Sequence, residues 1–140
     1  MRTMYESQQD LDNEARVKPI LENYFDVKLE KCPIKYQVDY YAFRDGKFVG
    51  PVEYKKRSHK YGKYETVVLS YDKGAVLKLI CNETLNLDKF LLVFEFTDGI
   101  YVCSSFSGWE VGFGGRTTNT RDAGDIEPIW HIPKNLFKKI

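Results

Sequence analysis

The sequence has few cysteines, and their spacing excludes the common zinc-binding folds. The three thiols, Cys32, Cys81 and Cys103, stand far apart and form no CxxC pair. Structural zinc sites need closely spaced pairs of ligands, so a zinc ribbon or finger is excluded. We expect thiols that are buried or half-buried in a reducing cytoplasm, because unpaired cysteine is among the residues most often found in protein interiors.

A strong net charge and long apolar runs are also lacking. The 140 residues carry 21 Lys and Arg against 20 Asp and Glu, a net charge of +1. Binding of nucleic acid would therefore depend on local clusters of basic residues. The longest apolar stretch, residues 90–94, is too short to cross a bilayer, and the polar residues 1–10 do not resemble a signal peptide. We expect a cytoplasmic protein without membrane contacts.

Composition and apolar spacing predict one globular domain, residues 1–140, with two main helices. Apolar residues recur at helical spacing from about Gln8 to Phe25. Ser70 is placed to cap a second helix that extends to about Asn82. The apolar side of this second helix is predicted to carry Val76, Leu79 and Ile80.

The remaining patterns indicate strands and turns. The continuous apolar run at Phe90–Phe96 is typical of a buried central strand, and Asp45-Gly46 is a strong hairpin signal. The predicted strands are Asp26–Lys31, Lys35–Phe43, Phe48–Lys56, Thr66–Leu69, Phe90–Phe96, Ile100–Ser104 and Ile126–Ile132. This order of elements predicts an α/β fold with a mixed central β-sheet flanked by α-helices and an additional C-terminal β-rich segment.

One group of charged residues has a spacing suited to chemistry. Side chains alternate along a strand, so Glu53 and Lys55 would point to one face and Tyr54 to the other. Asp39, between apolar neighbours on the preceding strand, is the candidate for a second carboxylate. Two carboxylates can hold a hard cation beside the ammonium. The alternative is that Asp39 forms an ion pair with Lys55 on an ordinary exposed sheet face.

The hairpin register decides between these readings. With a strict two-residue loop at Asp45-Gly46, Asp39 would lie opposite Val52 and face away from Glu53. One extra residue near Gly50-Pro51, or a three-residue loop, would set Asp39 opposite Glu53 on the same face. The metal-site hypothesis therefore requires one of these irregularities.

The order helix, Asp on a strand, Glu-x-Lys on the next strand, helix and strand resembles the PD-(D/E)XK nuclease superfamily, especially small phage-encoded or archaeal resolvase-like members. The resemblance covers about residues 12–96. It implies a restriction-endonuclease-like core in which Asp39, Glu53 and the backbone carbonyl of Tyr54 bind Mg²⁺, with Mn²⁺ as a substitute. It also implies that Lys55 positions the attacking water.

The resemblance extends to both helices. A helix carboxylate often approaches the metal in this superfamily, and Glu14 is preferred to Glu22 for this role; the alternative is a solvated helix charge. Lys73, at the start of the second helix, would lie near the phosphates. The sequence departs from the family pattern at Val38, where many members have proline.

Basic residues and tyrosines follow the Glu-x-Lys strand. Such interleaving suits a nucleic-acid strand, whose backbone is charged and whose bases stack. Tyr61 and Tyr64 could stack, whereas His59 and His131 form no convincing triad and are interpreted as structural or surface residues. The predicted nucleic-acid contacts are Lys56, Arg57, Lys60, Lys63 and Lys73, with Arg116 and Arg121 as a second zone.

These patterns favour a Mg²⁺-dependent deoxyribonuclease that acts as an endonuclease. A Holliday-junction-resolvase-like activity is one form that this endonuclease could take. Its partner would be duplex, single-stranded or branched DNA. Junction cutting would require a homodimer with two-fold symmetry. Two alternatives are a catalytically weak nucleic-acid-binding relative and a structural or interaction module of a larger assembly.

Overall fold

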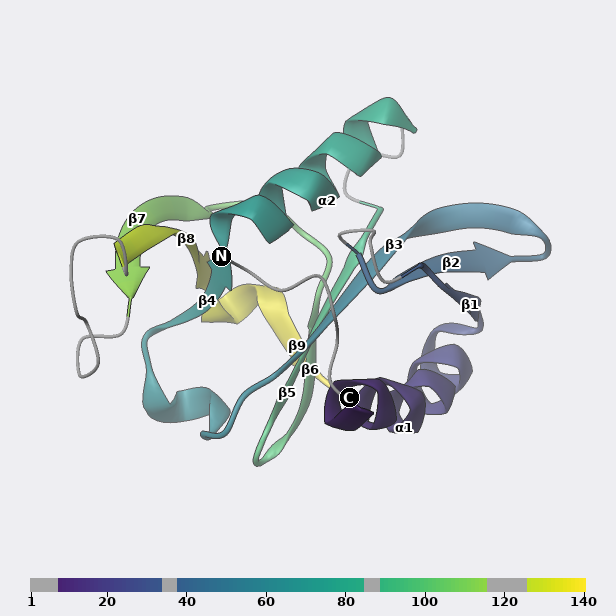
Figure 1. Cartoon of the computed structure of the whole chain (residues 1–140), viewed down its shortest axis with the longest axis horizontal. Helices are drawn as coiled ribbons and strands as arrows, with labels where there is room; N and C mark the ends of the chain where they lie inside the picture. The colour runs from purple at the N-terminus through teal and green to yellow at the C-terminus, as the bar shows by residue number, and fades with distance from the viewer. Residues whose placement is uncertain (1–7, 34–37, 85–88, 116–125) are drawn as a thin grey trace.

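The computed structural model describes residues 8–33, 38–84, 89–115 and 126–140. Within these ranges, two α-helices and nine strands form the fold (Figure 1). In chain order they are α1 (Gln8–Phe25), β1 (Lys28–Lys31), β2 (Tyr40–Arg44), β3 (Lys47–Lys56), β4 (Thr66–Ser70), α2 (Tyr71–Glu83), β5 (Leu91–Phe96), β6 (Gly99–Cys103), β7 (Glu110–Gly115), β8 (Ile126–Pro133) and β9 (Phe137–Lys139). Short 3₁₀ turns occupy Tyr61–Lys63 and Lys134–Leu136.

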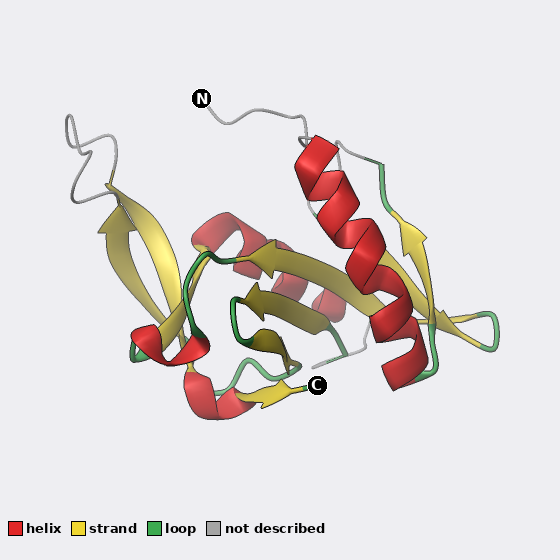
Figure 2. Cartoon of the chain, turned by 90° about the horizontal axis from the view of Figure 1, so that it is seen from below, coloured by secondary structure: helices red, strands yellow, loops and turns green. Residues whose placement is uncertain are grey.

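The strands form a larger mixed sheet and a smaller antiparallel one. The larger sheet has the order β1-β2-β3-β5-β6-β9, in which only the central β3–β5 pair is parallel. The smaller sheet has the order β4-β8-β7. Figure 2 shows α1 in front of the larger sheet and α2 behind it. The predicted α/β class, with a mixed sheet, flanking helices and a C-terminal β-rich segment, is confirmed.

Each helix covers one face of the larger sheet. Val17 and Leu21 of α1 pack in one buried cluster with Val52 and Val93. Leu77 of α2 packs in the other cluster, with Leu92 and Phe94 of β5. The central strand β5 is therefore buried on both sides, as its continuous apolar run predicts.

The α2 face is rotated from its predicted position. Its buried residues are Gly74, Leu77 and Cys81, whereas Leu79 is 56% exposed. The prediction of Leu79 on the apolar side was wrong, because the helix docks on the small sheet through Gly74. A Cβ at this position would collide with the indole of Trp130.

The hairpin between β2 and β3 has the required irregularity. Asp45 and Gly46 form a two-residue turn with φ of 53° and 77°, and Phe43 pairs with Phe48. Ala42 then pairs with Gly50, so Val49 is the extra residue of a β-bulge. A bulge near Gly50-Pro51 is confirmed, and continuing this register sets Asp39 opposite Glu53.

Gly50 stands beside the bulge for a steric reason. Its φ is 154°, and a Cβ there would collide with the carbonyl oxygen of Lys89. Only glycine lets β3 pass this close to the segment that leads into β5. The bulge and the close approach therefore depend on each other.

The starts of β2 and β1 differ from the sequence prediction, and so do the contacts of the residue that caps α2. β2 begins at Tyr40, and Asp39 lies in a bend before it; residues 35–37 of the predicted strand lie outside the described residues. β1 begins at Lys28 because Asp26 adopts a left-handed φ of 54°. Ser70 is the N-cap residue of α2, as predicted, but its side chain makes no capping hydrogen bond.

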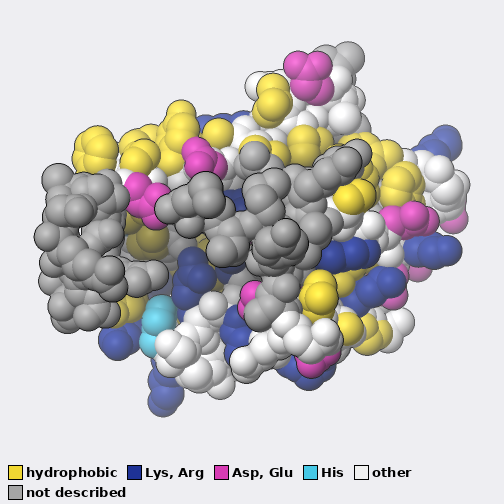
Figure 3. Space-filling view, viewed as in Figure 1, with side chains coloured by type: hydrophobic (Ala, Val, Ile, Leu, Met, Phe, Trp, Pro, Cys, Tyr) yellow, Lys and Arg dark blue, Asp and Glu magenta, His cyan; other side chains and the backbone are white. Residues whose placement is uncertain are grey.

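Exposed hydrophobic side chains gather along one edge of the molecule. In Figure 3, hydrophobic side chains gather along the upper edge, over β7 and α2, and many Lys and Arg lie below it. Phe113 of β7 is 77% exposed, and Leu79 of α2 is also an exposed apolar residue.

All three cysteines are buried, as predicted. No helix within the described residues has the length and apolar character needed to span a membrane.

Candidate active site

A polar cavity of about 300 Å³ lies at one end of the strands of the large sheet, where β3 extends past the first residue of β2. The first turns of α1 and α2 reach it from the two faces of the sheet. We call it the carboxylate cavity. It is lined by Asp10, Asn13, Glu14, Asp39, Tyr54, Lys55, Lys56, Arg57 and Lys73.

Glu53 is a buried carboxylate beneath this cavity. Its side chain is 1% exposed, and Oε2 lies 3.4 Å from Lys55 Nζ and 3.6 Å from Lys73 Nζ. Neither carboxylate oxygen has a hydrogen-bond partner among the described residues. Burial and the charge of Asp39 raise the pKa of Glu53 to about 7, and the two lysines oppose this shift.

Asp39 approaches the same strand from the bend before β2. Its Oδ2 accepts a hydrogen bond of 2.8 Å from the Tyr54 backbone N–H, and Oδ1 lies 3.8 Å from Lys31 Nζ. Burial raises the pKa of Asp39, against the effects of the Tyr54 N–H and Lys31. Asp39 and Glu53 are both buried, so the alternative of an ion pair on an exposed sheet face is excluded.

Glu14 of α1 belongs to the same cavity. It is 5% exposed, and its Oε1 lies 2.7 Å from Lys31 Nζ. Lys31 therefore stands between the carboxylates of Glu14 and Asp39. Glu22, the other helix carboxylate considered, accepts a hydrogen bond from the Leu29 backbone N–H instead.

Lys31 contacts two carboxylates of the cavity, Glu14 and Asp39, and the sequence pattern did not single it out. It ends β1, a short edge strand, where alternation along the strand gives no sign of a function. Only the pairing of Lys31 with Tyr40 brings its ammonium next to Asp39. Contacts of this kind depend on sheet order, which a single sequence does not specify.

The oxygen atoms available in the carboxylate cavity show whether it suits a divalent cation. Within the described ranges, no group of three or more His, Cys, Asp and Glu side chains is placed to hold a metal ion. Two carboxylates with a backbone carbonyl and waters are still a common ligand set for Mg²⁺. The buried oxygens of Glu53 lack hydrogen-bond partners among the described residues, and a cation would satisfy them. The residues present therefore fit such an ion.

The Tyr54 side chain lies on the opposite face from Glu53, as alternation predicts. Its hydroxyl donates a hydrogen bond of 2.6 Å to Glu95 Oε1, which Arg16 Nη2 also approaches at 2.6 Å. Lys56 Nζ lies 3.8 Å from the same oxygen. This network fixes the position of Tyr54 on β3. It therefore also fixes the directions of its sequence neighbours Glu53 and Lys55, which point to the opposite face of the sheet.

The predicted nucleic-acid contacts fall into distinct environments. Lys73 contacts Glu53 inside the cavity, whereas Lys60 and Lys63 are exposed around a 3₁₀ turn. Arg57 is half-buried, with its guanidinium 4.9 Å from the centre of the Phe94 ring. Arg116 and Arg121 lie outside the described residues.

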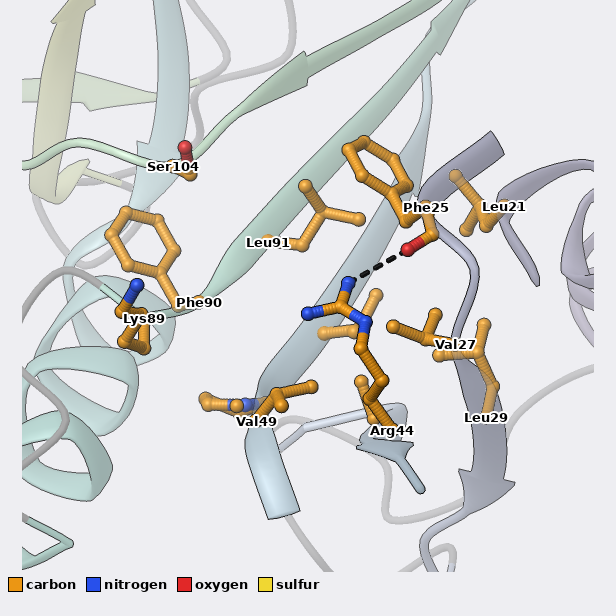
Figure 4. Close-up of a pocket in the computed structure, with 14 residues that line it drawn as sticks. Leu21, Phe25, Val27, Leu29, Arg44, Val49, Lys89, Phe90, Leu91 and Ser104 are labelled. Atoms are coloured by element: carbon orange, nitrogen blue, oxygen red, sulfur yellow. Dashed lines mark hydrogen bonds between the residues drawn. The ribbon is translucent and has the colours of Figure 1, made fainter. Parts of the chain in front are cut away.

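Another cavity, of about 260 Å³, is apolar and carries no catalytic group. It lies between α1, the β2–β3 hairpin and the start of β5 (Figure 4). Its arginine, Arg44, donates hydrogen bonds to the backbone carbonyls of Phe25 and Asp26. No Asp, Glu, His or Cys lines it, so the carboxylate cavity is the better candidate for the active site.

Comparison of the chain with family models gave a match. A family model described as "Phage putative PDDEXK endonuclease" matches residues 1–140. Searches of curated proteins and of solved structures gave no significant match.

Proposed function

The chain belongs to the phage PDDEXK endonuclease family, and from this premise we propose that it hydrolyses phosphodiester bonds of DNA in a reaction that depends on Mg²⁺. Family membership supports a nuclease that acts on nucleic acid. The observation that carries the finer proposal is the buried pair of carboxylates, Asp39 and Glu53, beside Lys55.

Asp39, Glu53 and the carbonyl of Tyr54 are the residues that would hold the cation. When bound, Mg²⁺ supplies positive charge that stabilises the charge developing on the phosphate and lowers the pKa of water. The hydrogen bond from the Tyr54 N–H to Asp39 Oδ2 orients one carboxylate before any ligand arrives. Alternation along β3 orients the other.

The two lysines near Glu53 have different origins and roles in this proposal. Lys55 shares a strand face with Glu53 and orients the attacking water. Lys73 comes from the first turn of α2 and would contact a phosphate oxygen of the substrate. Both ammonium groups lie within 4 Å of Glu53 Oε2.

The test is Mg²⁺-dependent cleavage of single-stranded, duplex and branched DNA. The unmodified protein is expected to cut, and Glu53→Gln and Lys55→Met are each expected to slow cleavage by roughly a hundredfold or more, as for loss of other positioned groups. Glu83→Gln, on the exposed end of α2, is the matched control. DNA binding without cleavage by the unmodified protein would instead support the catalytically weak relative.

A further inference from the structure

A third cavity, aromatic and of about 180 Å³, adjoins the carboxylate cavity. We call it the aromatic cavity. The His59 ring lies 5.0 Å from the Tyr64 ring and 5.4 Å from the Phe96 ring, and Tyr61 lies 5.5 Å from Phe96. Tyr64 is 54% exposed, so one wall of this cavity can be reached from solvent.

Arg57 lines both cavities. Its guanidinium lies over Phe94 and donates hydrogen bonds to the backbone carbonyls of Val68 and Lys56, at 3.1 and 3.4 Å. Burial lowers the pKa of Arg57, and no carboxylate among the described residues forms a salt bridge with it.

A cation removed from water is unfavourable unless an anion accompanies it. The guanidinium also has five N–H donors in a fork that matches phosphate. We therefore expect a ligand to supply the anion that forms a salt bridge with the Arg57 guanidinium.

The rim of the aromatic cavity favours an anionic ligand with a flat ring. Lys63 Nζ lies 5.3 Å from the centre of the Tyr64 ring, and Lys60 is exposed nearby in the chain. Aromatic walls stack on bases of any sequence, while basic groups follow the backbone. A cationic peptide would be repelled by the same rim.

We propose that the aromatic cavity binds one unpaired base of a DNA strand, and that Arg57 contacts a backbone phosphate between this nucleotide and the carboxylate cavity. This inference rests on the proposed function, which identifies the bound strand as DNA. A base stacked within a duplex cannot enter the cavity, so the substrate must be single-stranded, frayed or branched at this point, or must flip a base out.

The test measures binding separately from cleavage. Fluorescence anisotropy gives the Kd of a labelled single-stranded oligonucleotide in the Glu53→Gln background, with an abasic nucleotide placed at each position in turn. Loss of one particular base is expected to weaken binding by roughly 5- to 150-fold, the range for stacking of one base. Loss of the other bases should have smaller effects.

Three variants connect this effect to the aromatic cavity. Tyr64→Ala should weaken binding of the intact strand, and in this variant the abasic nucleotide at the sensitive position should cause no further loss of affinity. Tyr64→Phe should bind the intact strand as the unmodified protein does and should remain sensitive to the abasic nucleotide. Tyr24→Ala alters a tyrosine that is 48% exposed and lines neither cavity, so it should change nothing. The melting temperature of each variant checks that it is folded.

The inference is overturned by an equal penalty at every position, by an unchanged penalty in Tyr64→Ala, or by no binding of DNA. The proposed nuclease function is tested independently, because cleavage by the unmodified protein does not require a base in the aromatic cavity. Cleavage without a position-specific base effect would remove this inference alone.

Discussion

At the scale of single residues, the Glu53 carboxyl group is buried where water cannot solvate its ionised form. Its partners in the metal-free protein are the two ammonium groups of Lys55 and Lys73, at 3.4 and 3.6 Å. Alternation along one strand was enough to predict that Lys55 shares its face. The contact of Lys73 with Glu53 depends on where α2 docks, and the sequence predicted only that Lys73 lies near the phosphates.

Titration of Glu53 gives the first prediction. Its pKa in the folded protein, about 7, lies above the ordinary value of 4.5. The folded state therefore binds the proton more tightly, so this stabilisation is fully present below about pH 4.5 and is lost as the pH rises through about 7. The slope is at most about 1.4 kcal/mol per pH unit.

The measurement is the free energy of unfolding of metal-free protein from pH 4.5 to 8. Relative to Glu53→Gln, the unmodified protein should lose stability across this range, and Glu83→Gln should follow the unmodified protein. Parallel curves for the unmodified protein and Glu53→Gln would contradict the burial of this carboxyl group. Affinity for Mg²⁺ should rise over the same pH range, because only the ionised carboxylate binds.

Lys31 gives a second prediction at this scale. Its ammonium lies 2.7 Å from Glu14 and 3.8 Å from Asp39, so Lys31→Met leaves two buried carboxylates without this cation. We expect metal-free Lys31→Met to lose about 1–3 kcal/mol of stability, the usual cost of an unsatisfied buried polar group. Added Mn²⁺ should restore more stability to this variant than it adds to the unmodified protein.

Calorimetry with and without Mn²⁺ checks this expectation. Lys28→Met is the matched control, because Lys28 is an exposed lysine at the other end of the same strand, β1. Equal stability of the two variants, or no additional effect of Mn²⁺ on Lys31→Met, would show that the contacts of Lys31 contribute little.

At the scale of elements, the bulge in β3 decides whether the site exists. The metal-site hypothesis required either an extra residue near Gly50-Pro51 or a three-residue turn, because a strict hairpin turns Asp39 away from Glu53. The sequence could not predict that Val49 would be the extra residue. This choice depends on the approach of β3 to the carbonyl of Lys89, a contact between residues far apart in the chain.

Gly50→Ala tests this dependence. The variant needs a strained φ and collides with the Lys89 carbonyl, so we expect a loss of at least about 2 kcal/mol in the free energy of unfolding. Mn²⁺ binding should weaken as well, because the register of Asp39 shifts.

Denaturant unfolding and Mn²⁺ titration measure these effects. Gly62→Ala is the control, since a Cβ at that position meets no atom within 4 Å. A Gly50→Ala variant that keeps both stability and Mn²⁺ affinity would mean that the bulge does not hold the register.

At the scale of the whole molecule, the net charge of +1 hides an uneven distribution. The sequence predicted that the basic residues after β3, among them Arg57, Lys60 and Lys63, contact nucleic acid. The structure divides these residues between exposed lysines and the half-buried Arg57. The difference arises because Arg57 packs over Phe94 and donates a hydrogen bond to the Val68 carbonyl, long-range contacts that no local pattern indicates.

The exposed lysines are expected to set the salt dependence of DNA binding. Neutralising two phosphate contacts, by Lys60→Ala with Lys63→Ala, should make the slope of log K against log salt shallower by about 1.4 for a single strand. Lys47→Ala, an exposed lysine next to the hairpin turn, should leave the slope unchanged. An unaltered slope in the double variant would place the strand elsewhere on the molecule.

The central claim is that Asp39 and Glu53 hold one divalent cation between them. The most direct measurement is anomalous X-ray diffraction from a crystal soaked in Mn²⁺. We predict a peak bonded to a carboxylate oxygen of both residues. A Mn²⁺ peak bonded elsewhere, or none in the carboxylate cavity with Glu53 still contacting Lys55 and Lys73, would contradict the account.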